Sequence, residues 1–114
     1  MGAFRTMGLS RKLALIAALL VAAPALAHRL VIYAFVEDDI IVLEAFFSND
    51  APAAKGTITL KDGQGTVLAE MPLSDSGETR FAIPPGAAEG LAIEVLTDAG
   101  HEDYWILTPE DLDQ

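Results

Sequence analysis

Two histidines, His28 and His101, are the candidate metal ligands of this 114-residue chain, which contains no cysteine. His28 directly follows Ala25-Leu26-Ala27, a small-x-small triplet typical of a signal-peptidase site. Cleavage after Ala27 makes His28 the first residue, so that its free α-amine and its imidazole Nδ1 can chelate one metal ion together. Two ligands on one residue need little ordering from the fold, which lowers the entropic cost of the site.

The segment before His28 has the composition of a secretory signal peptide. Three basic residues precede an uncharged apolar run, 13–27, which is shorter than the roughly 20 residues that a helix needs to cross a bilayer. No further long apolar stretch follows it. We therefore predict that 1–27 is a cleaved signal peptide and that 28–114 is a single exported, periplasmic domain without a membrane span. An uncleaved N-terminal anchor is the alternative.

His101 lies in the segment "DAGHED" (98–103), which we predict to be a loop. If it shares a site with His28, two imidazoles and one amine form a three-nitrogen ligand set. Such a set suits Ni²⁺, Co²⁺ or Cu²⁺ better than Ca²⁺ or Mg²⁺. Glu102 and Asp103 are candidates for an oxygen ligand or for an acceptor of a ring N–H. The alternative is that both acids and His101 are solvated loop residues and that His28 is incidental.

The rest of the chain is predicted to form short strands separated by turn residues. The segments rich in branched and aromatic residues predict an all-β fold, a small antiparallel β-sandwich of about seven strands, immunoglobulin-like or transthyretin-like. Asp38-Asp39 predicts a tight hairpin, and 109–114 predicts one helical turn. If the first and last strands run parallel, His28 and His101 lie at the same end of the sandwich. The predicted strands are 29–37, 40–47, 57–61, 66–73, 79–83, 91–97 and 104–108.

The charge balance narrows the classes of partner. Residues 28–114 contain four basic and seventeen acidic residues, a formal net charge of −13. Such a surface argues against nucleic-acid binding and against an anionic membrane, and it is compatible with a cationic partner or cargo. With no cysteine there is no disulfide, so packing of the core alone must stabilise the domain.

The sequence carries little sign of catalysis. Ser48, Ser74 and Ser76 lie in predicted loops without a nearby histidine, and the motif G-x-S-x-G is absent. We therefore predict that the protein is not an enzyme. The one exception to weigh is a copper "histidine brace" oxygenase, which uses an N-terminal histidine, but this domain is small for both that site and a substrate surface. Trp105 is predicted to pack in the core.

Several short motifs, in order, resemble one family. The strands "VIYAFVE" and "EAFFS", the loop "PAAKG", the turn "DGQG", the pair Gly100-His101 and the ending "WILTPEDL" are similar to those of the extracytoplasmic accessory proteins of nickel/cobalt ECF-type transporters (NikL/NikK-type). The resemblance covers essentially all of 28–114. It implies a β-sandwich that works beside a membrane nickel/cobalt transporter subunit, with His28 and His101 contacting the metal.

The functional expectation is therefore a periplasmic metal-binding accessory protein that assists nickel or cobalt uptake. Ni(II) is the first choice of metal, with Co(II) and Cu(II) as alternatives. Two other readings stay open: a periplasmic copper-binding protein with the same N-terminal histidine site, and a metal-free structural interaction module. Copper binds more tightly than nickel at most nitrogen sites, so the ligand set alone does not identify the metal.

Overall fold

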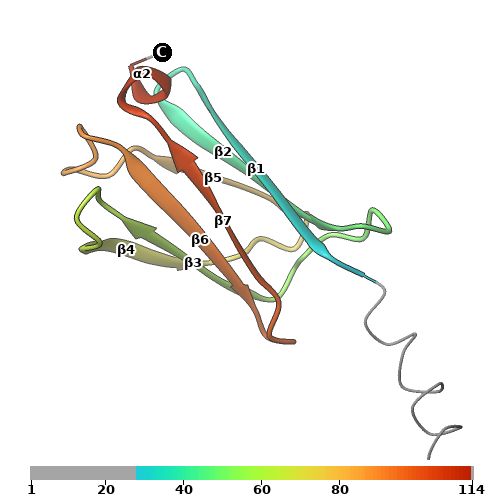
Figure 1. Cartoon of the computed structure of the whole chain (residues 1–114). Helices are drawn as coiled ribbons and strands as arrows, with labels where there is room; N and C mark the ends of the chain where they lie inside the picture. The colour runs from blue at the N-terminus through green and yellow to red at the C-terminus, as the bar shows by residue number, and fades with distance from the viewer. Residues whose placement is uncertain (1–27, 114) are drawn as a thin grey trace, which may run out of the picture.

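The computed structural model describes residues 28–113, which form seven strands and one short helix (Figure 1). The predicted signal peptide lies outside the described residues. All seven strands and the core that they enclose belong to 28–113, so a chain that starts at His28 contains the whole sandwich. The elements are β1 (Leu30–Glu37), β2 (Ile40–Phe47), β3 (Gly56–Lys61), β4 (Val67–Pro72), β5 (Glu78–Ala82), β6 (Leu91–Thr97), β7 (Glu102–Leu107) and α2 (Pro109–Leu112).

The strands form two antiparallel sheets, with the orders β1-β2-β5 and β4-β3-β6-β7. This confirms the predicted seven-stranded all-β sandwich. An immunoglobulin domain likewise places its first, second and fifth strands in one sheet and its third, sixth and seventh in the other. The fourth strand here pairs with β3 at the edge of the larger sheet. Of the two predicted variants, the strand order is therefore the immunoglobulin-like one.

Alternation of apolar side chains produces the two layers. In β1 the buried residues Leu30, Ile32 and Ala34 alternate with more exposed ones, as expected for a strand that covers a core with one face only. The inward faces of the other strands complete a single cluster of buried side chains. Its fully buried large members are Ile41, Leu43, Ile58, Leu60, Leu91, Ile93, Val95 and Leu107.

The predicted hairpin between the first two strands is confirmed. β1 pairs with β2 from Leu30 opposite Phe47 to Glu37 opposite Ile40, which leaves Asp38 and Asp39 as a two-residue turn. Both turn residues have positive φ, 53° and 65°, as a type I′ turn requires. This turn matches the right-handed twist of the strands and thereby sets their register.

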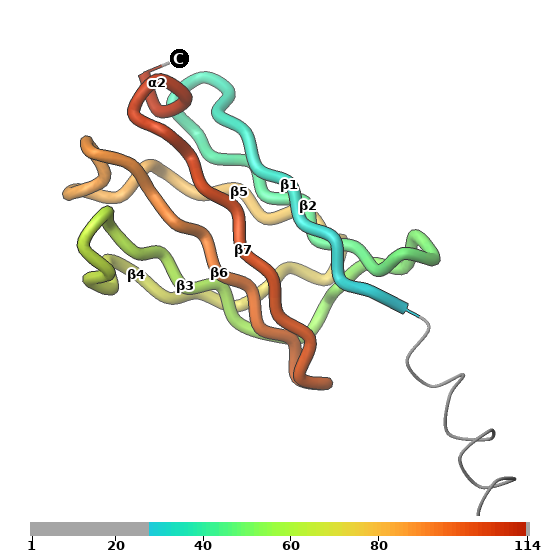
Figure 2. The backbone as a smooth tube through the Cα atoms, in the orientation of Figure 1, coloured from blue at the N-terminus to red at the C-terminus, as the bar shows by residue number. Residues whose placement is uncertain are grey.

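β1 and β7 are the edge strands on the same side of the sandwich. They lie side by side, in different sheets, and run in the same direction toward the end that carries α2 (Figure 2). This common direction is the condition under which His28 and His101 were predicted to lie at the same end. No ladder joins the two strands within the described residues. Both strands start at the opposite end from α2, so the structure places His28 and His101 at that same end (Figure 1).

One predicted boundary is wrong by more than one residue. β7 begins at Glu102, so Glu102 and Asp103 lie in a strand and not in a loop. The reason is pairing: Leu96 and Val95 of β6 lie opposite these two acids and extend the ladder into a polar stretch. The predicted helical turn is present as α2, which starts with a capping box between Thr108 and Asp111. Within 28–113, no helix is long and apolar enough to cross a membrane.

Candidate functional site

His28 is exposed and lies two residues before β1. The residue between them is attached to the end of β2. The Arg29 N–H donates to Ser48 Oγ at 3.1 Å, and the Ser48 N–H donates to the Arg29 carbonyl at 2.8 Å. These two bonds continue the hairpin ladder beyond Leu30. The backbone is therefore held up to Arg29, while the His28 side chain extends into solvent.

His101 is held at the end of the β6–β7 turn by reciprocal bonds to one residue. Its N–H donates to Thr97 Oγ1 at 3.0 Å, and its carbonyl accepts from the Thr97 N–H at 2.8 Å. Between them Gly100 has a φ of +89°, a left-handed conformation that favours glycine. Thr97 is the one buried polar residue of the described chain. Sequence analysis missed Thr97, and its only sequence signal is its place before the turn residues "DAGH".

The imidazole of His101 packs against Phe47 of the other sheet. Its ring centroid lies 5.3 Å from that of Phe47, and the two rings meet edge to face at 72°. Phe47 is paired with Leu30, which follows Arg29 and His28. A short series of contacts therefore connects the two histidines across the two sheets. Phe47 was not singled out from the sequence, because only the packing of one sheet on the other brings it to His101.

The His101 Nδ1 atom is enclosed and has no hydrogen-bond partner. An enclosed polar atom without a partner costs about 1–3 kcal/mol, so such atoms are uncommon in folded proteins. A bound metal ion or a reorientation of the ring toward solvent would remove this cost. The donor chemistry of His101 therefore fits a transition-metal ligand, because one of its ring nitrogens is not committed to another group.

The other predicted donors do not gather around the histidines. Within 28–113 no group of three or more histidine or acidic side chains is placed to hold a metal ion. Glu102 and Asp103 are exposed, and Asp103 accepts a hydrogen bond from the neighbouring Tyr104 N–H at 2.8 Å. A metal site at this end would therefore have to use the two histidines, with the α-amine of a chain cleaved before His28 as its third donor.

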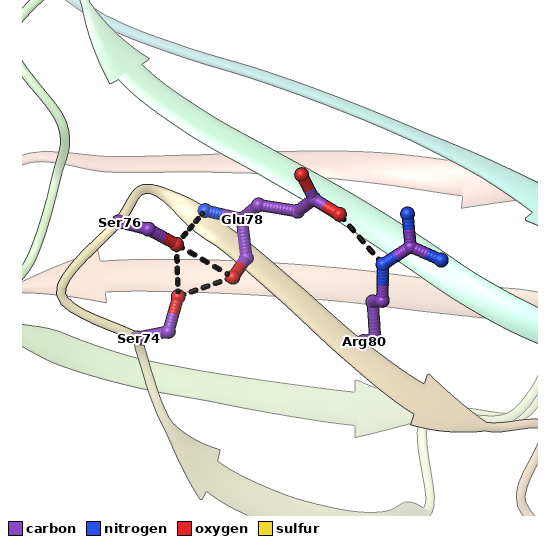
Figure 3. A network of polar contacts seen from close by, with 4 residues as sticks. All are labelled: Ser74, Ser76, Glu78 and Arg80. Atoms are coloured by element: carbon purple, nitrogen blue, oxygen red, sulfur yellow. Dashed lines mark hydrogen bonds and ion pairs between the residues drawn. The ribbon is translucent and has the colours of Figure 1, made fainter.

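The three loop serines make hydrogen bonds that stabilise the local backbone. Ser74 Oγ donates to the Glu78 carbonyl, and Ser76 Oγ accepts from the Glu78 N–H at 3.2 Å (Figure 3). The Glu78 carboxylate in turn accepts from Arg80 Nε at 2.6 Å. Ser48 accepts from the Arg29 N–H. Within the described chain none of these three serines is hydrogen-bonded to an imidazole, so each has a structural explanation that needs no catalysis.

The remaining aromatic prediction is confirmed. Trp105 packs, half-buried, against the core, and its ring meets Tyr33 of β1 edge to face at a centroid distance of 5.0 Å. This contact bridges the two edge strands near their middle. Trp105 is therefore part of the packing between the sheets, and it lies four residues after His101 in the chain.

Comparison with known proteins adds no relative: no protein-family model and no curated protein matches the chain.

Proposed function

We propose that the protein is an extracytoplasmic metal-binding accessory protein that assists nickel or cobalt uptake by a membrane transporter subunit. The observation that carries the proposal is that His28 and His101 precede β1 and β7, two strands that start at the same end of the sandwich, and that the His101 Nδ1 is enclosed and unpartnered. The resemblance of the short strand and turn motifs to nickel/cobalt transporter accessory proteins points in the same direction.

The proposed ligand set uses both ends of His28. After cleavage behind Ala27, the α-amine and the imidazole of His28 bind the metal as a chelate, and His101 supplies a second imidazole. These nitrogens must be deprotonated to bind the metal, so affinity falls as the pH is lowered. An intact Ala27–His28 peptide bond leaves an amide in place of the amine. Removal of the signal peptide is therefore the step that completes the site.

The acidic surface suits a protein that handles cations. A net charge of −13 over 28–114 attracts divalent cations and raises their local concentration. A site of three nitrogens leaves coordination positions open, so a metal can pass to a transporter without full unfolding of the site. Nickel and cobalt ions are cargo in this proposal, and the protein carries out no chemical step on them.

Calorimetric titration of Ni²⁺ tests the site. The chain that starts at His28 is compared with a chain carrying one extra N-terminal alanine and with His101→Ala. We expect one metal ion per chain, at least tenfold weaker binding when the amine is displaced, and about tenfold weaker binding without His101. Lys55→Ala, which changes an exposed residue with no role in the site, serves as the control and should bind as the parent does.

Each other outcome has a clear meaning. If the alanine-extended chain binds Ni²⁺ as tightly as the parent, the N-terminal chelate is wrong. If none of the chains binds Ni²⁺, Co²⁺ or Cu²⁺, the metal-free interaction module is the better explanation. Because copper binds nitrogen sites more tightly whatever the biological role, nickel accumulation by cells, with and without this protein beside a transporter, separates nickel handling from copper handling.

A further inference from the structure

The outer edge of β1 is unpaired. β1 forms a ladder only with β2, and the Ser48 N–H to Arg29 carbonyl bond identifies which residues face that ladder. In an antiparallel pair, hydrogen-bonded residues alternate. The odd-numbered residues of β1 therefore bond to β2, and the backbone N–H and C=O groups of the even-numbered ones point to the free edge. The edge-facing residues are Leu30, Ile32, Ala34 and Val36.

This edge lacks the features that usually prevent strand-to-strand association. Residues 30–36 contain no charged residue, proline or glycine. The other edge strands are protected: β4 ends at Pro72, β5 contains the Glu78–Arg80 ion pair, and β7 starts with two acids. A long, uncharged edge strand is the kind of strand that pairs with another chain.

The outward face of this segment is complementary to its own inverse. Its side chains, in order, are Arg29, Val31, Tyr33, Phe35 and Glu37: a cation, three apolar or aromatic residues, and an anion. Val31 and Tyr33 are 44% and 48% exposed, so apolar side chains lie on the solvent side of this edge strand. A second copy turned end for end presents the same face with its charges reversed.

We propose that two copies of this protein associate by antiparallel pairing of their β1 strands, with Tyr33 on the two-fold axis. In this register Leu30 lies opposite Val36 of the second copy and Ile32 lies opposite Ala34, so residues with edge-facing backbone groups meet one another and hydrogen-bond. The two three-stranded sheets become one continuous six-stranded sheet. The proposal does not depend on metal binding.

Charge complementarity identifies a second copy as the occupant of this edge. The register brings Arg29 opposite Glu37 of the second copy, once at each end of the paired strands. Within the described chain the two ion pairs are Lys61–Glu94 and Arg80–Glu78, and neither uses Arg29 or Glu37. Although the whole surface is acidic, the paired segment is locally neutral. Repulsion between distant charges is screened at physiological salt.

β7 flanks the outer edge of β1 without forming a ladder with it. A hollow of about 280 Å³ lies between the two strands, lined by residues that include Tyr33, Phe35 and Trp105. The Tyr33 ring meets Trp105 edge to face across this gap, at a centroid distance of 5.0 Å. The contacts along this edge are therefore between side chains, and no ladder within the described chain uses the outer backbone groups of β1.

Charge reversal tests the register. Sedimentation of the chain that starts at His28, over micromolar to millimolar concentrations, should show a dimer. Arg29→Glu and Glu37→Arg each place like charges opposite one another at both ends, and each should weaken self-association about tenfold or more. An equimolar mixture of the two variants regenerates both opposite-charge pairs and should dimerise as the parent does. Arg80→Glu, with the same change of net charge as Arg29→Glu, is the control for that variant and should leave self-association unchanged.

Cysteine cross-linking provides a second readout, because the chain has no cysteine of its own. Tyr33→Cys brings two thiols together at the axis, where opposed Cα atoms lie about 4.5 Å apart, within the range of a disulfide. Val31→Cys has a similar exposure, but its two copies lie four residues apart along the strands, about 13 Å. We expect a disulfide dimer from Tyr33→Cys alone. A monomer at all concentrations, equal cross-linking of both variants, or failure of the mixture to dimerise would overturn the proposal.

Discussion

His28 and His101 occupy the same end of the sandwich but are positioned by different means. His101 has its backbone tied to the buried Thr97 and its ring against Phe47 of the other sheet. His28 has an exposed side chain, and its attachment is one residue away, through Arg29 and Ser48. The position of His101 depends on the packing of the two sheets, and the position of His28 depends on the β1–β2 hairpin.

This difference has a consequence for a shared metal site. A ligand that is already held in place loses little entropy when a metal binds, whereas an exposed side chain loses more. In the proposed site, a chelate within one residue would offset that loss for His28, because its two donors need no further element to align them. The fold would then have to position only His101 accurately, and it holds His101 through Thr97 and Phe47.

The largest expected effect comes from Gly56, which packs against the strand that leads to His101. A Cβ atom on this residue would lie 2.3 Å from the Leu96 carbonyl oxygen and 2.8 Å from the Thr97 Cα. Both contacts are with backbone, so Gly56→Ala should lower the free energy of unfolding by about 3 kcal/mol. Urea denaturation measures it. Gly63→Ala, whose nearest new contact is 3.8 Å away, should change stability by less than about 0.5 kcal/mol.

Metal should stabilise the chain by a comparable amount. For the chain that starts at His28, Ni²⁺ at a hundredfold excess over its dissociation constant should raise the free energy of unfolding by about 2.7 kcal/mol. The same Ni²⁺ concentration should stabilise the alanine-extended chain much less, because His28 then carries a peptide amide in place of its α-amine and can no longer chelate the metal. Thermal unfolding with and without EDTA measures both. Equal stabilisation of the two chains would show that the amine is not a ligand.

Thr97→Val tests whether the β6–β7 turn positions His101. The substitution keeps the shape of the side chain but removes the acceptor of the His101 N–H, and should cost about 1–2 kcal/mol of stability. It should also weaken Ni²⁺ binding several-fold, because His101 is then less well positioned. Thr57→Val, at an exposed residue on the neighbouring strand, is the matched control. Unchanged Ni²⁺ affinity in Thr97→Val would mean that the turn does not preorganise His101.

Ser48→Ala should have the smallest effect. The Arg29 N–H that it leaves is exposed, so water replaces the lost hydroxyl and the cost is about 0.5 kcal/mol or less. Because His28 carries two donors of its own, we expect Ni²⁺ affinity to change less than twofold, as measured by calorimetry. A larger loss of affinity in Ser48→Ala than in Thr97→Val would reverse the comparison between the two histidines.

Most strands could be predicted because their signal is local. β2 and β6 begin and end where their apolar runs do, and the Asp38-Asp39 turn is recognisable because two residues separate two such runs. Glu102 and Asp103 were assigned to a loop because they are polar. Their strand conformation comes from the opposite residues of β6, a contribution that composition does not reveal.

The seven strands, the lack of a disulfide and the restriction of imidazoles to His28 and His101 follow from the sequence alone. Tertiary packing is needed to establish which sheet each strand joins, that β1 and β7 run in the same direction, and that Phe47 contacts the ring of His101. The physical reason is the range of the interactions. Strand and turn formation depends on neighbouring residues, whereas the contact of Phe47 with His101 depends on how two sheets pack across one core.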